Sequence, residues 1–190
     1  QIGVVHDGPM RWQARPGLGL CLTGADHGCA SVYDNVGVDV MYGLVYGDQL
    51  HASVHGGLFL SSFDPAAAFA AVGVAVKLHL GTDVAITADP QLGVALSDRD
   101  VNDDALFLPI DLSFQVGAPT TIKLLTGLAG GLEQFGDNVQ IPVGVGVVQN
   151  LTEHIDVGAR VSFDNLLGAQ PDGVDATDAR SLALLLSIRS

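Results

Sequence analysis

The sequence predicts an all-β fold, a closed antiparallel up-and-down β-barrel of about ten strands, with eight strands as the alternative. The first observation is an apolar alternation: from 139 to 147 every odd residue is Val or Ile, and the residues between them are Gln, Pro or Gly. Side chains alternate between two faces only in strands. The second observation is that short and long connections alternate along the chain, which is typical of a meander with tight turns at one rim and loops at the other.

Further segments of the chain show the same alternation, each with one apolar face. We predict strands at residues 10–21, 31–46, 50–61, 69–80, 84–96, 105–116, 121–132, 139–150, 155–165 and 179–189. Short connections are expected at 47–49, 81–83, 117–120 and 151–154, and long, acidic ones at 22–30, 62–68, 97–104, 133–138 and 166–178. Residues 1–9 are expected to form an N-terminal extension, and residues 10–190 a single barrel domain.

The composition narrows the class of protein. Of 190 residues, 48% are apolar and only 15% are charged, against about a quarter charged in an ordinary soluble domain. This composition excludes a disordered chain, and no apolar run approaches the about 20 residues of a membrane-spanning helix. The net charge of −13, with eight Lys and Arg residues, argues against a nucleic-acid partner.

The polar face decides which side of the predicted sheet points outward. A soluble lipocalin-like barrel, the alternative, would expose this face to water and carry many Lys and Glu residues on it. Here the face is mostly Gly, Ala, Ser and Gln with scattered charges, whereas the apolar face carries no charge over the predicted strands. A charge at mid-depth in a bilayer costs about 2–4 kcal/mol, so the uncharged band predicts a transmembrane barrel. The charged residues expected to pair inside its lumen are Arg11, Arg15, Asp39, Lys77, Asp89, Asp111, Lys123, Asp156, Arg160, Asp164 and Arg189.

The clearest local pattern is a strand, a polar turn and a second alternating strand in Gln149-Asn150-Leu151-Thr152-Glu153-His154-Ile155-Asp156-Val157-Gly158-Ala159-Arg160-Val161-Ser162-Phe163. With this hairpin, the chain resembles the small outer-membrane β-barrel proteins of Gram-negative bacteria, the outer-membrane-protein A/X/W-like group, without indicating one subfamily. The resemblance implies short periplasmic turns, longer extracellular loops, and contact with outer-membrane lipids and lipopolysaccharide. Because the numbering begins at Gln1, we expect an exported chain whose signal peptide has been removed.

Two features depart from that family. Its members usually end in an aromatic residue that the barrel-assembly machinery reads, whereas this chain ends Leu186-Ser187-Ile188-Arg189-Ser190. Aromatic residues make up only 6% of the chain, so any aromatic girdle at the membrane interfaces must be thin.

Three histidines are expected on the inner face, toward the rim with the tight turns: His51, His55 and His79. His51 and His79 lie at similar distances from the 62–68 connection, so they are expected to face each other across a strand pair. Imidazoles in such a cluster would form a metal site or a proton-sensitive constriction. The alternative is hydrogen-bonded packing beside Asp39 and Lys77.

Acidic loops are candidate calcium sites. Asp98, Asp100 and Asn102 stand at the first three oxygen-ligand positions of a calcium loop, but Asp103 replaces the glycine and Pro109 the bidentate Glu of an EF-hand. A looser Ca²⁺ or Mg²⁺ site here, or at Asp172, Asp175 and Asp178, is one interpretation, and a solvated acidic rim is the other. No other cofactor is expected.

Cys21 and Cys29 bracket the first long loop. In an oxidising compartment they are expected to form a disulfide that holds this loop, with a free thiol or lipid attachment as the alternative.

The leading functional prediction is a non-enzymatic barrel with a narrow, charge-filled lumen and a structural or adaptor role, packed through small outward residues against other envelope proteins. The alternative is a narrow passive, porin-like channel for ions or small solutes. Less favoured are an outer-rim hydrolase using Asp26 and His27 near residues 98–104, and a soluble lipocalin-like carrier.

Overall fold

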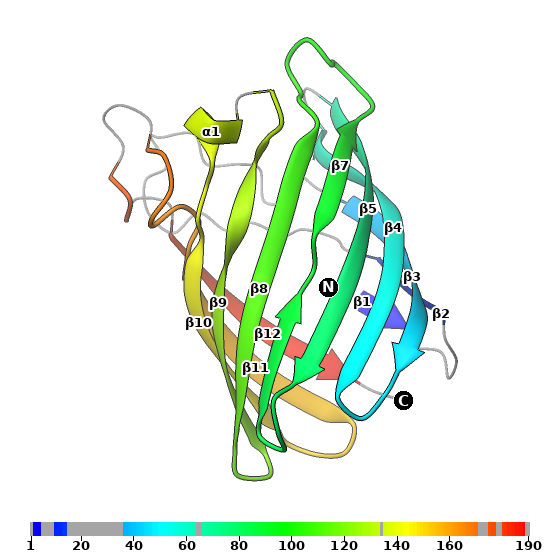
Figure 1. Ribbon diagram of the computed structural model, residues 1–190, viewed down its shortest axis with the longest axis vertical. Coiled ribbons are helices and arrows are strands. Elements are labelled where there is room, and N and C mark those ends of the chain that lie inside the picture. The colour runs from blue at the N-terminus through cyan, green and yellow to red at the C-terminus, as the bar shows by residue number, and fades with distance from the viewer. Residues whose placement is uncertain are drawn as a thin grey trace.

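In the computed structural model, the described part of the chain comprises residues 2–4, 10–14, 36–63, 66–133, 135–170, 175–177 and 180–188. Its strands form one antiparallel sheet that curves around an inner face (Figure 1). The helical residues in this part belong to the short α1 (Phe135–Asn138), and no helix there has the length and apolar character needed to cross a bilayer. The strands are β1 (Ile2–Val4), β2 (Met10–Ala14), β3 (Val36–Tyr46), β4 (Leu50–Phe63), β5 (Ala66–His79), β6 (Val84–Ala88), β7 (Gln91–Ala95), β8 (Ala105–Val116), β9 (Thr120–Gly131), β10 (Val143–Asn150), β11 (Ile155–Phe163) and β12 (Arg180–Ile188).

The described strands follow one another as an antiparallel meander. β6 and β7 are two halves of one strand, since both lie between β5 and β8 and only Asp89 and Pro90 separate them. With these halves joined and the three-residue β1 set aside, the described meander has ten strands, as the sequence predicts.

The break between β6 and β7 follows from Pro90, which has no N–H to donate to a ladder. The Pro90 carbonyl still accepts a hydrogen bond from Val74 N at 3.0 Å, and Asp89 N donates to Pro109 O at 3.1 Å. The bend therefore stays attached to both neighbouring strands, and it gives Asp89 a fixed position on the inner face.

The four tight turns also form as predicted. Gly81 (φ +139°) and Gly117 (φ +68°) adopt backbone conformations that favour glycine. Gly47 N donates to Leu50 O at 2.9 Å and closes the β3–β4 turn, and Leu151 N donates to Ile155 O at 2.9 Å in the β10–β11 turn. These turns lie together at one rim of the sheet, here called the turn rim (Figure 1).

One predicted connection is wrong. The expected 62–68 loop is largely strand, because β4 continues to Phe63 and β5 begins at Ala66. The alanine-rich start of β5 has weak intrinsic strand preference, and pairing with β4 overrides it. Within the N-terminal extension predicted for residues 1–9, Ile2–Val4 pair with β2 as β1.

The ends of the sheet are β1 and β12. Among the described residues, no hydrogen-bonded pairing joins β12 to β1 or β2. The antiparallel ten-stranded meander is thus confirmed, and closure into a barrel stays a prediction.

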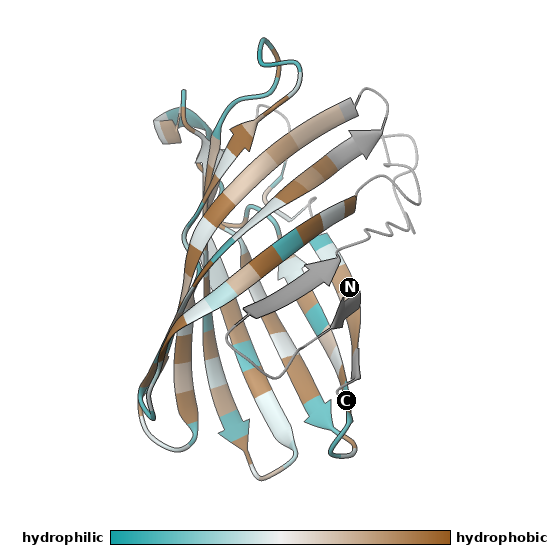
Figure 2. Ribbon diagram, turned by 90° about the vertical axis from the view of Figure 1, so that its right-hand side faces the viewer, coloured by the Kyte–Doolittle hydropathy of each residue, from teal (hydrophilic) through white to brown (hydrophobic). Residues whose placement is uncertain are grey.

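Hydrophobic residues alternate with less hydrophobic ones along the strands (Figure 2), so the two faces of the sheet differ in character. In the described residues, the fully buried polar side chains are Asp39 (2% exposed), His55 and Asn165, and the only buried apolar ones are two alanines. Large aliphatic side chains lie instead on the outer face, where Leu184 is 82% exposed. The inner face therefore holds charge, and the outer face exposes apolar surface.

Candidate functional site

A buried histidine is held between two carboxylates on the inner face. His55 on β4 places Nδ1 3.0 Å from Asp39 Oδ2 on β3, and Nε2 2.7 Å from Asp89 Oδ1 at the β6–β7 bend. Gln91 Nε2 donates a hydrogen bond of 2.7 Å to the other oxygen of Asp89. We call Asp39, His55, Asp89 and Gln91 the inner network.

Glycine on the strand between them makes this network possible. His55 pairs in register with Gly73 of β5, and Gly73 pairs with Gln91 of β7. Without a side chain at residue 73, the imidazole lies over β5 and reaches the next strand. The network thus connects β3, β4 and the β6–β7 bend across β5.

The hydrogen bonds constrain the protonation of the network. A neutral imidazole has one N–H and one bare nitrogen, whereas the imidazolium donates from both nitrogens. Only the imidazolium can donate to two ionised carboxylates at once, and charge-assisted hydrogen bonds of this kind are the strong ones. The arrangement therefore suits one positive charge between two negative ones, and it acts as a cross-link between strands.

Gly73→Ala is expected to destabilise the protein by about 1–3 kcal/mol, the usual cost of overpacking. A Cβ at residue 73 would collide with the His55 ring and lie 2.8 Å from Gln91 Cγ. Equilibrium unfolding in urea measures the loss. Gly93→Ala is the matched control, because its Cβ would meet the movable Phe107 ring at 3.3 Å; equal losses in the two variants would contradict the prediction.

Among the residues that the structure describes, the predicted lumen charges form one Lys–Asp pair. Lys123 Nζ lies 4.0 Å from Asp111 Oδ2, and this is the one such pair on the inner face of the described residues. Arg160 is on the inner face opposite Gly146, and its buried Nε has no hydrogen-bond partner in the described part of the chain. Asp156 lies on the same face of β11 and has a partner.

Further lumen predictions have different outcomes. Asp164 was expected inside the lumen, but β11 ends at Phe163, so Asp164 is an exposed turn residue. Arg11 of β2 pairs in register with Met41. Arg15 and Arg189 lie outside the described residues.

The three histidines do not form one cluster. His51 and His79 face each other as predicted, with ring centroids 5.7 Å apart, but His55 belongs to the inner network. The described residues contain no group of three or more His, Cys, Asp or Glu side chains that could hold a metal ion. The metal interpretation of this cluster therefore has no support from the geometry.

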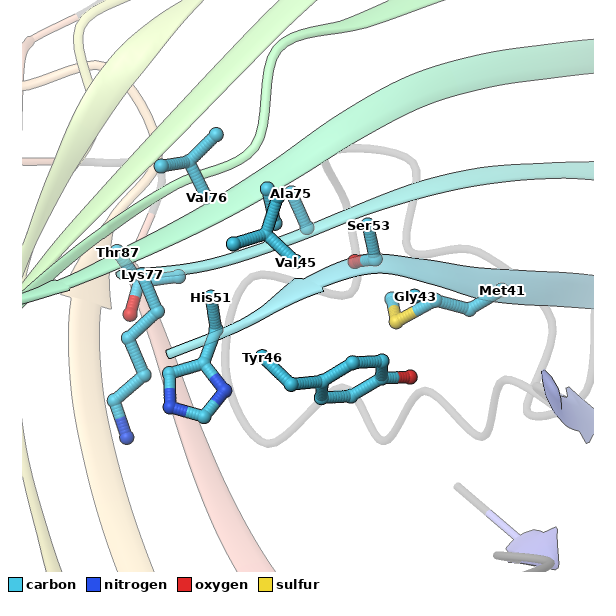
Figure 3. Close-up of a pocket in the computed structure, with 11 residues that line it drawn as sticks. Met41, Gly43, Val45, Tyr46, His51, Ser53, Ala75, Val76, Lys77 and Thr87 are labelled. Atoms are coloured by element: carbon cyan, nitrogen blue, oxygen red, sulfur yellow. The ribbon is translucent and has the colours of Figure 1, made fainter. Parts of the chain in front are cut away.

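A cavity of about 430 Å³ opens beside His51 near the turn rim (Figure 3). Tyr46 meets the His51 ring edge-on at 6.4 Å, and Lys77 pairs in register with His51 and with Thr87. Ser53 completes the polar lining on β4. The cavity thus gathers basic and hydroxyl side chains from β3, β4, β5 and β6.

The predicted calcium loop folds as a turn. Asp98 has a positive φ of 43°, and its carbonyl accepts hydrogen bonds from Val101 N and Asn102 N, both at 2.8 Å. The Asn102 side-chain nitrogen donates to Ser97 O at 3.1 Å, so this amide helps to hold the turn. Asp100 is exposed.

Asp104 and Arg99, here called the clasp, hold the loop next to this turn against β7 by hydrogen bonds. Asp104 Oδ1 accepts a hydrogen bond of 3.0 Å from Ala95 N, and Asp104 Oδ2 accepts one of 3.1 Å from Arg99 Nη2. Arg99 Nη1 also donates to Ala95 O at 2.7 Å. The Ala95 amide first, and the Arg99 guanidinium second, hold the pKa of Asp104 below its usual value.

Asp104→Asn is expected to raise the rate of tryptic cleavage after Arg99 about fivefold at pH 8, because losing its charge-assisted hydrogen bonds frees the loop. In the parent protein the lowered pKa means that the clasp is complete above the usual aspartate pKa and is lost as the pH falls through the lowered value. Hydrogen exchange of the Ala95 amide against pH reports this loss. Asp100→Asn is the control, and an equal effect there would contradict the clasp.

Asn165 is a structural residue that the sequence analysis missed. It is 8% exposed, and its side-chain oxygen accepts hydrogen bonds of 3.0 Å from Ile141 N and Gly168 N. Asn165 therefore holds the end of β11 against the segment before β10. It also lines a second cavity of about 680 Å³ at the rim opposite the turn rim, here called the loop rim. The available signal was an Asn three residues before a Gly at a strand end, a pattern typical of side-chain-closed turns.

The remaining predictions fall on residues without a structural description or with little of one. The residues outside the described part of the chain are Cys21, Cys29, Asp26, His27, Asp172 and Asp178, and Asp175 lies in the short described segment 175–177.

Comparisons with protein-family models, curated proteins and solved structures found no match for this chain.

Proposed function

We propose that the chain is a transmembrane β-barrel of the bacterial outer membrane, closed through its end strands, with a structural or adaptor role. The observation that carries the proposal is the inverted burial of the sheet. Carboxylates and an imidazole occupy the inner face, and the outer face exposes large aliphatic side chains. In water such a surface would be a large apolar patch, whereas a bilayer covers it.

The apolar surface is continuous across the sheet. One row of outer-face residues in direct register crosses β4, β5, β6, β8, β9, β10, β11 and β12 without a polar side chain: Leu50, Leu78, Ile86, Leu112, Leu124, Val145, Val161 and Leu182. Soluble sheets rarely expose such a row, and outer-membrane barrels require it. It therefore supports a lipid-facing outer surface.

The inner network supports a filled lumen. It spans from β3 to the β6–β7 bend, and Asp111 and Lys123 add a charged pair on β8 and β9. Side chains fill barrels of about eight strands, and ten strands enclose only slightly more space. A lumen filled in this way would leave no wide aqueous path through the barrel.

A narrow channel is the second candidate function. The cavities of about 430 Å³ and about 680 Å³ lie at the turn rim and the loop rim, respectively. Partial connection between them would give a path whose charges select solutes.

Two measurements test these functions. The protein is expected to leave solution when detergent is withdrawn and to remain folded in lipid vesicles; a chain that stays dispersed without detergent would contradict the membrane proposal. Planar-bilayer recording then separates the two roles, because a filled scaffold gives no steady conductance and a channel does. The adaptor role further predicts a complex in gentle detergent, and a protein found only as a monomer would contradict that part.

A further inference from the structure

The turn-rim cavity has basic side chains at its wall in an acidic protein. The chain has a net charge of −13, yet Lys77, His51 and His79 lie together on the inner face of β4 and β5. Lys77 pairs in register with His51, and the His51 and His79 rings are 5.7 Å apart. In the part of the chain described here, none of the three has a carboxylate partner. These basic groups are therefore available to a ligand.

The other inner-face charges near the cavity are already engaged. Asp39 and Asp89 bind His55, and Asp111, which lies beyond Thr87 in the same register row, is 4.0 Å from Lys123. Hydroxyl groups of Tyr46, Ser53 and Thr87 also line the cavity, and Figure 3 shows Lys77, His51 and Tyr46 side by side along its wall. Hydroxyl, ammonium and imidazolium groups are the donors that bind phosphate and similar oxyanions.

We propose that the turn-rim cavity binds a small free oxyanion of the phosphate class, with Lys77 as the fixed positive charge, His51 in the lining, and His79 beside His51 as a second imidazole. The volume of about 430 Å³ lies in the range of small-molecule sites. The side chains lie on the inner face, away from the lipid-facing surface proposed above, so the site suits a solute better than a lipid headgroup. A binding site in this cavity is compatible with either a filled scaffold or a channel.

Histidine NMR signals give the direct test, since the chain has six histidines. Inorganic phosphate, added to the protein in an uncharged detergent at constant pH, is expected to shift the His51 and His79 signals saturably. Lys77→Gln is expected to weaken this binding about tenfold, the loss of one charge-assisted hydrogen bond, and Lys77→Arg to restore it. His51→Gln and His79→Gln are expected to weaken it, whereas His154→Gln, in the exposed β10–β11 turn, is not.

The pH profile is measured with inorganic sulfate, whose charge is constant between pH 5.5 and pH 8. Sulfate is expected to bind about tenfold more tightly at pH 5.5, because imidazolium charges then face the anion. The groups that face His51 and His79 are Tyr46 on β3, His55 on β4, Lys77 on β5 and Asp111 on β8, with Asp48 and Asp83 in the adjoining turns and no titratable inner-face side chain on β6. The double variant His51→Gln/His79→Gln is expected to remove the pH dependence while circular dichroism shows an unchanged fold.

Several outcomes would overturn the assignment. The first is that inorganic phosphate causes no saturable shift of the His51 and His79 signals. The second is an equal shift of the His154 signal, and the third is an unchanged phosphate affinity of Lys77→Gln. A response to vesicles of phosphatidylglycerol but not to inorganic phosphate would also overturn it, since the ligand would then be a lipid headgroup. A chain that binds phosphate but fails to insert into vesicles would instead contradict the proposed membrane function and leave this site intact.

Discussion

Leu124→Lys is expected to destabilise the folded protein in lipid vesicles by about 2–4 kcal/mol, the cost of a lysine near the middle of the bilayer on the outer face of a barrel. Leu124 lies near the middle of β9, is 46% exposed, and has only Leu112 and Val145 beside it in register. Its ammonium group would therefore have no charged partner on that face. Urea unfolding of the vesicle-inserted protein measures the difference.

The next residue provides the control for this prediction. Leu125 belongs to the inner face and lies opposite Asp111 in register, so Leu125→Lys places the same charge beside a carboxylate. We expect a loss of at most about 1 kcal/mol in that variant. If the outer face instead contacted water, Leu124→Lys would be the harmless substitution, and a ranking in that order would contradict the membrane proposal.

The strands could be predicted because a period of two is a local property of the chain. β8, for example, runs from Ala105 to Val116 in both the prediction and the structure. The start of β5 could not, because a run of alanines carries no alternation and its strand conformation comes from pairing with β4. Closure of the sheet depends on contacts between distant ends of the chain, for which a local pattern has no signal.

The candidate site was predictable only in part, for a similar reason. Alternation places His55 and Asp39 on the inner face, but it does not say which side chains meet. Their contact with Asp89 depends on the bare backbone at Gly73 and on the bend at Pro90, two features of neighbouring strands. Metal binding by three histidines was the natural hypothesis from composition, and register separates His55 from the other two.

The inner network gives the largest expected effect of any single substitution. His55→Leu is expected to cost about 3–5 kcal/mol of the free energy of unfolding, since it leaves two carboxylates on the inner face without their shared cation. Asp39 and His55 are 2% and 4% exposed, so water cannot readily replace the lost hydrogen bonds. Urea unfolding in vesicles measures the loss, and His51→Leu, on the same face of the same strand but without a carboxylate partner among the described residues, is expected to cost under about 1 kcal/mol.

A triple variant separates lost charge pairing from lost packing. When Asp39→Asn and Asp89→Asn accompany His55→Leu, no uncompensated charge remains in the network, and most of the stability is expected to return. If the triple variant were as unstable as His55→Leu alone, the imidazole would act through its shape and not through its charge. Recovery would instead mean that the charge of His55 stabilises the two carboxylates on this face, which is how a sheet with an apolar exterior can hold its charged residues inside.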